Sequence, residues 1–153
     1  MKRILLGSAF TLAAAAAQAC PNPQAGGDVD YGYTGDILTR AREYAVTIGG
    51  PYALSDCGVP YPGYVTTAPT MSFRLARMDF YPLEIRVEAP CDAILLVNDA
   101  SGNWHYNDDT DDGYNPRINL RGSAPLNGRM DIWVGSYSGE TCYGDLILET
   151  ERR

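Results

Sequence analysis

The stretch LEIRVEAPCDAILLVNDASG, residues 83–102, contains the two strand patterns on which the fold prediction rests. Residues 83–88 alternate between apolar and charged side chains, which is typical of a β-strand with one buried face. Residues 93–97 form a short continuous apolar run, as in a strand that is covered on both faces. Turn-forming residues follow each segment. We therefore expect two β-strands here, the second with neighbours on both of its faces.

The alternating pattern recurs along the rest of the chain. It is found in residues 43–48, 71–76, 83–88 and 130–135, and residues 143–150 end the chain with one more strand pattern. Only residues 35–42 have helix-like spacing, enough for one helical turn. Many short strands without a long helix predict an all-β protein, namely a single-domain antiparallel β-sandwich. A closed barrel is the alternative.

The N-terminus has the pattern of a secretory leader. Lys2 and Arg3 precede an apolar stretch at residues 4–17, and Ala17-Gln18-Ala19 is a small-x-small cleavage site. Residues 1–19 are therefore predicted to be a signal peptide, and residues 20–153 the exported domain. A buried N-terminal helix is one alternative. Lipidation of Cys20 is another. We expect the protein to be periplasmic or secreted.

The charge of the chain excludes one class of partner. The formal net charge is −7, and the predicted cleavage would remove two of its basic residues. An acidic protein without a basic patch has little to attract phosphate groups, so we expect no nucleic-acid binding. After the leader, no apolar run is long enough for a transmembrane helix.

Four cysteines lie in the predicted exported domain, at positions 20, 57, 91 and 142. An even number in an exported chain predicts two disulfides. Three pairings are open, and we favour Cys20–Cys57 and Cys91–Cys142. The first would tether a Gly/Pro-rich N-terminal segment, residues 20–42, that we expect to be irregular. A zinc site is the alternative, although the wide spacings fit it poorly.

An acidic loop carries the candidate metal ligands. These are Asp99, Asp108, Asp109, Asp111 and Asp112, interleaved with asparagines. Calcium takes six to eight oxygen ligands and often finds them in such a loop. Residues 108–119 fit an EF-hand poorly, since Asn119 occupies the last ligand position and no helix flanks the loop. We expect a calcium ion as cofactor, with Asp108 and Asp109 as the first ligands; a solvated acidic loop is the alternative.

The sequence contains no pattern of a catalytic site. His105 is the only histidine, and the Gly-x-Ser-x-Gly motif of many serine hydrolases is absent. A pair of carboxylates for glycoside hydrolysis stays open, because acidic residues are plentiful. Trp133 and Tyr137 form a candidate ligand surface for sugar stacking, with a role in the core as the alternative.

Three segments together resemble a known domain. They are CDAILLVNDASGNWHYNDD, NPRINL and DIWVGSYSGETC. They resemble short exported bacterial proteins and, more distantly, the bacterial pre-peptidase C-terminal domain. This resemblance implies a jelly-roll-like β-sandwich and a secreted accessory or binding role, and it maps the family's paired aspartates onto Asp108 and Asp109. Relatives sometimes carry a serine-peptidase label, which we attribute to neighbouring protease domains.

Two functions follow as hypotheses. The first is a non-enzymatic binding or accessory module with a calcium-ordered acidic loop and a protein or glycan partner. The second is a small secreted hydrolase, acting on peptides or sugars through His105 or a carboxylate pair. The absence of a catalytic pattern favours the first.

Overall fold

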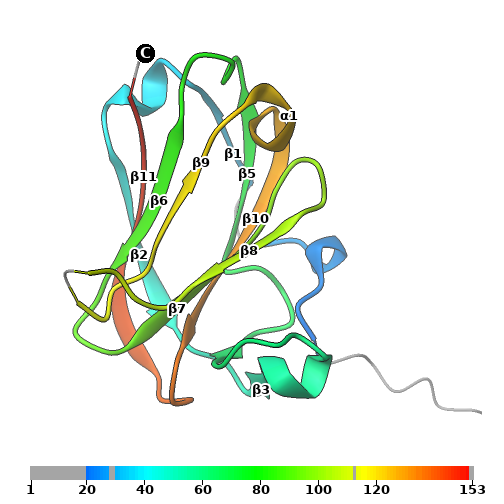
Figure 1. Cartoon of the computed structure of the whole chain (residues 1–153), viewed down its shortest axis with the longest axis vertical. Helices are drawn as coiled ribbons and strands as arrows, with labels where there is room; N and C mark the ends of the chain where they lie inside the picture. Colours follow the sequence, from blue (N-terminus) through cyan, green and yellow to red (C-terminus); the bar gives the residue numbers. More distant parts are fainter. Residues whose placement is uncertain (1–19, 28–29, 112, 152–153) are drawn as a thin grey trace, which may run out of the picture.

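The chain folds into two β-sheets that pack face to face (Figure 1). The computed structural model describes residues 20–27, 30–111 and 113–151, so the predicted signal peptide lies outside the described residues. The strands are β1 (Asp30–Thr34), β2 (Arg42–Ile48), β3 (Tyr52–Ala53), β4 (Tyr64–Val65), β5 (Met71–Ala76), β6 (Leu83–Glu88), β7 (Ala93–Asn98), β8 (Trp104–Asn107), β9 (Arg117–Leu120), β10 (Gly128–Ser136) and β11 (Cys142–Thr150). Four short helices complete it: η1 (Pro23–Ala25), η2 (Ile37–Thr39), η3 (Leu54–Cys57) and α1 (Ser123–Leu126).

One sheet has the order β2-β11-β6-β9, and all its neighbours are antiparallel. In the other, β10 is central: β7 and then β8 lie on one side, and β5 and then β1 on the other. Beyond the end of β5, Ser136 of β10 pairs with Tyr64 of β4, which continues to β3. The predicted sandwich is confirmed, with one difference: β1 pairs with β5 in parallel.

The main core lies between the two sheets. It is formed by the apolar residues of the alternating strands, including Phe73, Ile85, Ile132 and Leu146, which are fully buried. Tyr31 and Tyr44 pack against this core at the open side near β1 and β2. Burial of these faces is what fixes the register of the strands, because a shift by one residue would turn every apolar side chain outward.

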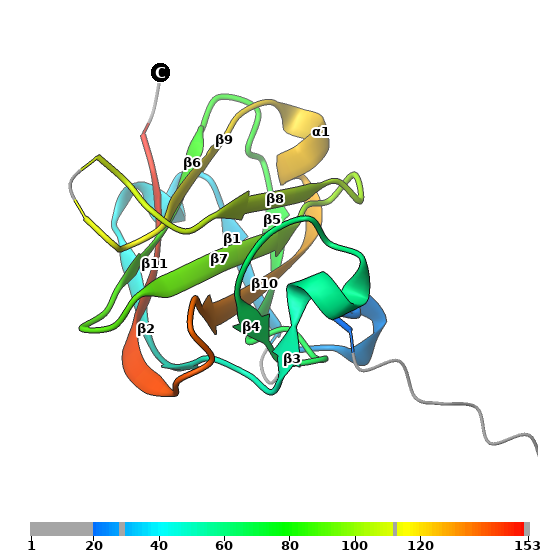
Figure 2. The same ribbon diagram turned by 60° about the horizontal axis from the view of Figure 1, so that its bottom comes forward.

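A second, smaller core lies on the outer face of the β10 sheet. It consists of Leu54, Val65, Ile94, Leu96 and Trp133, and it is covered by the segment that runs through β3, η3 and β4 (Figure 2). This explains the continuous apolar run of β7, whose residues are buried on both faces as predicted. The covering segment lies against the strand backbone: a Cβ added to Gly135 would lie 2.4 Å from the carbonyl oxygen of Tyr64.

Burial changes the interpretation of Trp133. Its side chain is 0% exposed, and its indole N–H donates a hydrogen bond to the carbonyl of Thr67 at 3.3 Å. Trp133 therefore does not form a ligand surface. The reason is that β10 is covered on both faces, so the side chain opposite Ile132 and Val134 also lies in a core.

Both disulfides pair as predicted. Cys20 is bonded to Cys57, and Cys91 to Cys142. The N-terminal segment is more regular than expected, because β1 adds to the edge of β5 and η1 is fixed beside it. Gly27 donates its N–H to the hydroxyl of Ser72, and the guanidinium of Arg129 donates to the carbonyl of Pro23. The described residues include no helix that is long and apolar enough to cross a membrane.

Candidate functional site: a tyrosine face beside an acidic cluster

Asp99, one of the predicted metal ligands, uses its carboxylate for hydrogen bonds within a turn. Its side chain lies between β7 and β8 and is buried, and its carboxylate accepts the backbone N–H groups of Ser101 and Asn103 at 2.8 and 3.0 Å. Nε2 of His105 lies 2.8 Å from the same carboxylate. Burial raises the pKa of Asp99, but the hydrogen bonds from His105, Asn103 and Ser101 outweigh it, so the pKa is below its usual value. These contacts satisfy the carboxylate within the turn.

Asp108 and Asp109 act by charge on Asp92, and so does Glu140; the sequence interpretation selected neither Asp92 nor Glu140. Burial raises the pKa of Asp92, and the negative charges of Asp109, Asp108 and Glu140 raise it further. Oδ1 of Asp92 is buried without a hydrogen-bond partner among the described residues. These four residues are referred to below as the acidic cluster. They come from three loops that meet at one end of the sandwich.

The last two predicted aspartates are Asp111 and Asp112. Asp111 is exposed in the tight turn closed by Thr110 and Gly113. Asp112 lies outside the described residues. Within the described ranges, no three acidic, histidine or cysteine side chains converge closely enough to hold a metal ion as they stand. Calcium therefore stays a prediction.

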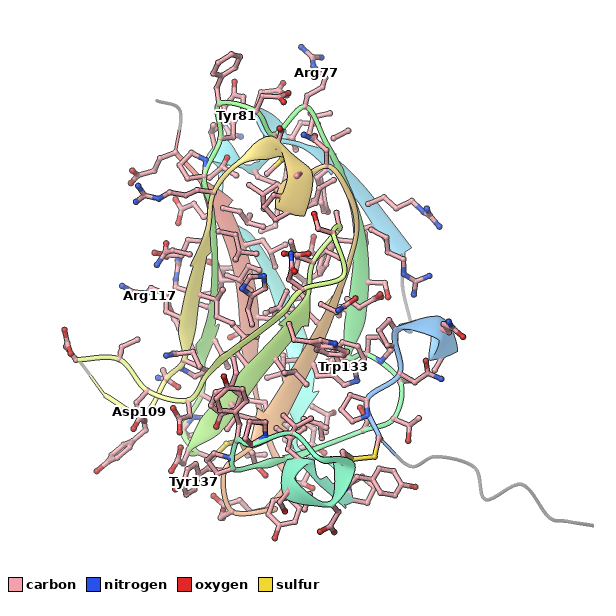
Figure 3. The ribbon with its side chains drawn as sticks, turned by 45° about the vertical axis from the view of Figure 1, so that its right-hand side comes forward. Arg77, Tyr81, Asp109, Arg117, Trp133 and Tyr137 are labelled. Atoms are coloured by element: carbon pink, nitrogen blue, oxygen red, sulfur yellow. A yellow bond between two sulfur atoms is a disulfide. The ribbon has the colours of Figure 1, made fainter. Side chains whose placement is uncertain are left out.

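A surface of tyrosines borders the acidic cluster. Tyr61 and Tyr106 stack with ring centroids 4.4 Å apart and planes inclined by 3°, and the Tyr106 hydroxyl donates to the carbonyl of Pro62. Tyr61, Tyr64 and Tyr137 line a shallow hollow of about 460 Å³. Tyr61, Tyr64, Tyr106 and Tyr137 are called the tyrosine face. Tyr137 and Asp109 lie at the same end of the molecule, opposite Arg77 and Tyr81 (Figure 3).

Three contacts hold the tyrosine face in place. The N–H of Tyr137 donates to the carbonyl of Asp92 at 2.9 Å, which joins the face directly to the acidic cluster. Leu54 of the second core lies beneath it, and its N–H donates to the carbonyl of Gly63. Gly63 has φ +111°, a conformation that favours glycine, and an added Cβ would contact Ile94. The rings are thus presented by a constrained loop on a packed base.

Burial and charge also affect the hydroxyl of Tyr106. Burial raises its pKa first, and the negative charge of the Asp108 carboxylate raises it further. Tyr106 therefore keeps its proton throughout the physiological range and donates a hydrogen bond to the carbonyl of Pro62. Tyr61 and Tyr137 are 46% and 44% exposed, so about half of each side chain is free to contact a ligand.

The hydrolase alternative would need a His–Asp pair and a nucleophile beside it. The described residues contain the pair and no such nucleophile. His105 and Asp99 form a pair, as in many active sites. Among the described residues, however, the side chain of His105 hydrogen-bonds to Asp99 alone, and no Ser, Thr or Cys side chain completes the pair. The pair closes the turn between β7 and β8.

Sequence comparison and structure comparison give different results for this chain. No family model matches it, and no curated protein matches it in sequence. A solved structure that is similar is the pre-peptidase C-terminal domain of a collagenase from Bacillus anthracis, with 12% identity and a TM-score of 0.45. The match covers 80% of this chain and 95% of the other.

Proposed function

We propose that this protein is a non-enzymatic, exported binding module that holds a neutral polysaccharide on its tyrosine face. The observation that carries the proposal is the set of half-exposed tyrosines, which line an open hollow above a packed second core. Aromatic rings combine a large apolar contact area with a polar hydroxyl, and they lose little conformational entropy on binding.

The chemistry of the surroundings selects the class of ligand. The carboxylates of Asp108 and Glu140, which do not line the hollow itself, can accept hydrogen bonds from the hydroxyl groups of a sugar chain that extends beyond it. The same carboxylates would repel an anionic glycan. The open shape of the hollow suits a chain that passes across it rather than a small molecule that is enclosed.

Calcium is the second part of the proposal. One oxygen of Asp92 is buried without a hydrogen-bond partner among the described residues, and the charges of Asp108, Asp109 and Glu140 act on the same carboxyl group. Carboxylate oxygens are the ligands that calcium prefers. Rotation of exposed side chains would be needed to bring the four acids together around the ion. Calcium would neutralise their mutual repulsion and would fix the loop that carries Asp108 next to Tyr106.

The binding proposal is tested with a panel of neutral and anionic polysaccharides in affinity gel electrophoresis. We expect one or more neutral polysaccharides to retard the mature protein. Tyr61→Ala and Tyr137→Ala should abolish the retardation, because each removes a stacking ring. The matched control is Tyr143→Ala, which removes a tyrosine that is 75% exposed and lies outside the hollow. The proposal is contradicted if all three variants lose the retardation equally, or if none of the neutral polysaccharides retards the protein.

The calcium proposal is tested separately by calorimetric titration of chelator-treated protein, with magnesium as the control ion. We expect saturable calcium binding that is lost in Asp108→Asn/Asp109→Asn and in Asp92→Asn. Asp111→Asn, which alters an exposed acid outside the acidic cluster, should bind calcium as the unmodified protein does. If no heat of binding is measured up to millimolar calcium, the calcium proposal is wrong. The polysaccharide proposal is then tested without the ion.

A further inference from the structure

A second surface lies on the open side of the sandwich, away from the tyrosine face. A groove of about 760 Å³ runs between β2 and the segment of residues 66–71 that leads from β4 into β5. Five consecutive residues of β2, 43–47, line it. Side chains of a strand point alternately to its two faces, so consecutive residues can line one groove only along the backbone edge of the strand. The groove therefore follows the edge of β2.

The backbone edge of β2 is free on this side. β2 is the outermost strand of its sheet and pairs with β11 alone. Among the described residues, the backbone groups of residues 43–47 have no hydrogen bonds apart from those of the β2–β11 pairing. An edge strand with unpaired N–H and C=O groups is a template for one more strand.

Proteins usually protect such an edge with proline, lysine or other charged side chains, and along this groove β2 carries one charged side chain, Glu43. β2 contains no proline and no lysine, and its exposed side chains along the groove are Glu43, Ala45 and Thr47. The opposite side of the sandwich is closed, since the N–H of Arg117 in β9 donates to the side chain of Asn107 in β8 at 2.8 Å. The open edge of β2 is thus a specific feature of one side of the fold.

We propose that β2 binds an extended peptide segment of a partner protein as an additional strand. The groove is lined in part by the rings of Tyr31 and Tyr44 and by Met71, whose apolar surface suits the side chains on one face of such a strand. Five residues of β2 match a peptide of about five residues, or roughly 16 Å. This inference is independent of the proposed polysaccharide site.

Charge indicates the composition of the peptide. The chain has a formal net charge of −7, and Glu43 is the charged side chain among the residues that line the groove. The guanidinium of Arg42, the residue before Glu43, stacks on the ring of Tyr33 instead, with its central carbon 5.8 Å from the ring centroid. The groove therefore favours a segment with an apolar residue at every second position and a basic residue that reaches Glu43.

A second copy of this chain fits the groove less well. β2 is held in its own sheet by β11, so it cannot leave its place to fill the groove of another molecule. Pairing of two β2 edges would leave both grooves empty and would bring two acidic molecules together. An extended segment of a different protein avoids both costs.

The probe is a phage-displayed library of random nonapeptides, selected on the mature protein and counter-selected on Ala68→Trp, in which a large side chain fills the groove. One enriched peptide is then titrated into ¹⁵N-labelled protein. We expect amide shifts in residues 43–47 and 66–71, and protection of the β2 amides from hydrogen exchange. Methylation of alternate peptide nitrogens that face β2 should weaken binding by about tenfold or more, because each removes a backbone hydrogen bond.

Charge reversal gives a test that does not depend on the shape of the groove. Glu43→Arg should weaken binding of a basic peptide several-fold, and Asp79→Arg, which alters an exposed acid that does not line the groove, should not change it. Three results would overturn the inference. They are selection of no peptide that distinguishes the unmodified protein from Ala68→Trp, shifts confined to the tyrosine face, and a dimer in light scattering whose β2 amides are protected without peptide.

Discussion

The second core offers the most informative perturbation, because a small cluster there supports the proposed ligand face. Leu54 is fully buried in it, with Val65, Ile94, Leu96 and Trp133 as its partners. Leu54→Ala removes three carbon atoms from a site with few neighbours. The direct effect should be a local opening of the segment from β3 to β4, with the two-sheet sandwich intact.

The magnitudes decide between local and global unfolding. Replacing a fully buried leucine by alanine costs about 2–5 kcal/mol. A domain of this size is stable by about 5–15 kcal/mol, so the sandwich as a whole should survive the change. The covering segment contributes the fully buried Leu54 and Val65 to the second core, with the half-buried Val59 packed against them. Its local stability should therefore be close to or below the cost of the substitution, and the segment should open.

The two tryptophans of this chain provide the assay. Trp133 is buried under the segment, and Trp104 is 47% exposed beside it. In a Trp104→Phe background, Leu54→Ala should shift the Trp133 emission to the red and accelerate hydrogen exchange in residues 52–65. The control is Leu38→Ala, a fully buried leucine of the main core. It should lower the global unfolding midpoint by a comparable free energy without a selective effect on residues 52–65.

One result would refute this reasoning. If Leu54→Ala lowers the global midpoint as Leu38→Ala does and leaves exchange in residues 52–65 coupled to global unfolding, the segment is part of one cooperative unit. The tyrosine face would then be supported by the whole sandwich rather than by the second core.

Three further predictions concern the loops and the disulfides. The pKa of Asp99 is lowered in the folded state, so the ionised carboxylate stabilises the fold above the ordinary pKa of about 3.9, and this stabilisation is lost as the pH falls below that value. Asp99→Asn should lower the free energy of unfolding in urea at pH 7 by about 1–3 kcal/mol and remove this dependence on acid. Loss of the Cys91–Cys142 bond, which spans 51 residues, should cost at most about 4 kcal/mol in the chain-entropy description, and an unchanged melting temperature in Cys91→Ser/Cys142→Ser would contradict it. The pKa of Asp92 is raised, so its charge destabilises the fold at neutral pH; Asp92→Asn should melt at a higher temperature than the unmodified protein in chelator, and a lower one would show that the charge is well accommodated.

The alternating strands could be predicted from the sequence because their burial is simple. Residues 71–76 and 83–88 form β5 and β6 with the predicted bounds, since one face of each strand packs on the main core. The strand β1 was not predicted, because it gains its stability from pairing with the edge of β5 rather than from an alternating pattern of its own. The short strands β3 and β4 were missed for a similar reason: two residues are too few for any period.

The candidate site was predicted only in part. Asp108, Asp109 and Tyr137 were selected from the sequence, and the structure places them at the same end of the molecule. Asp92 and Glu140 lie at sequence positions far from the acidic run, so only the meeting of three loops brings them to Asp108 and Asp109. Tyr61 and Tyr64 lie in a Pro/Gly-rich segment without periodicity, and their role depends on the second core that the sequence does not reveal. Trp133 was a reasonable candidate by composition and is excluded by burial.

The most direct test of the central claim is calorimetric titration of a neutral oligosaccharide, chosen from the polysaccharide that retards the protein most, into the mature protein. The account predicts a saturable heat that is lost in Tyr61→Ala and Tyr137→Ala and unchanged in Tyr143→Ala. A heat that survives both substitutions in the tyrosine face, or one that disappears equally in Tyr143→Ala, would contradict it.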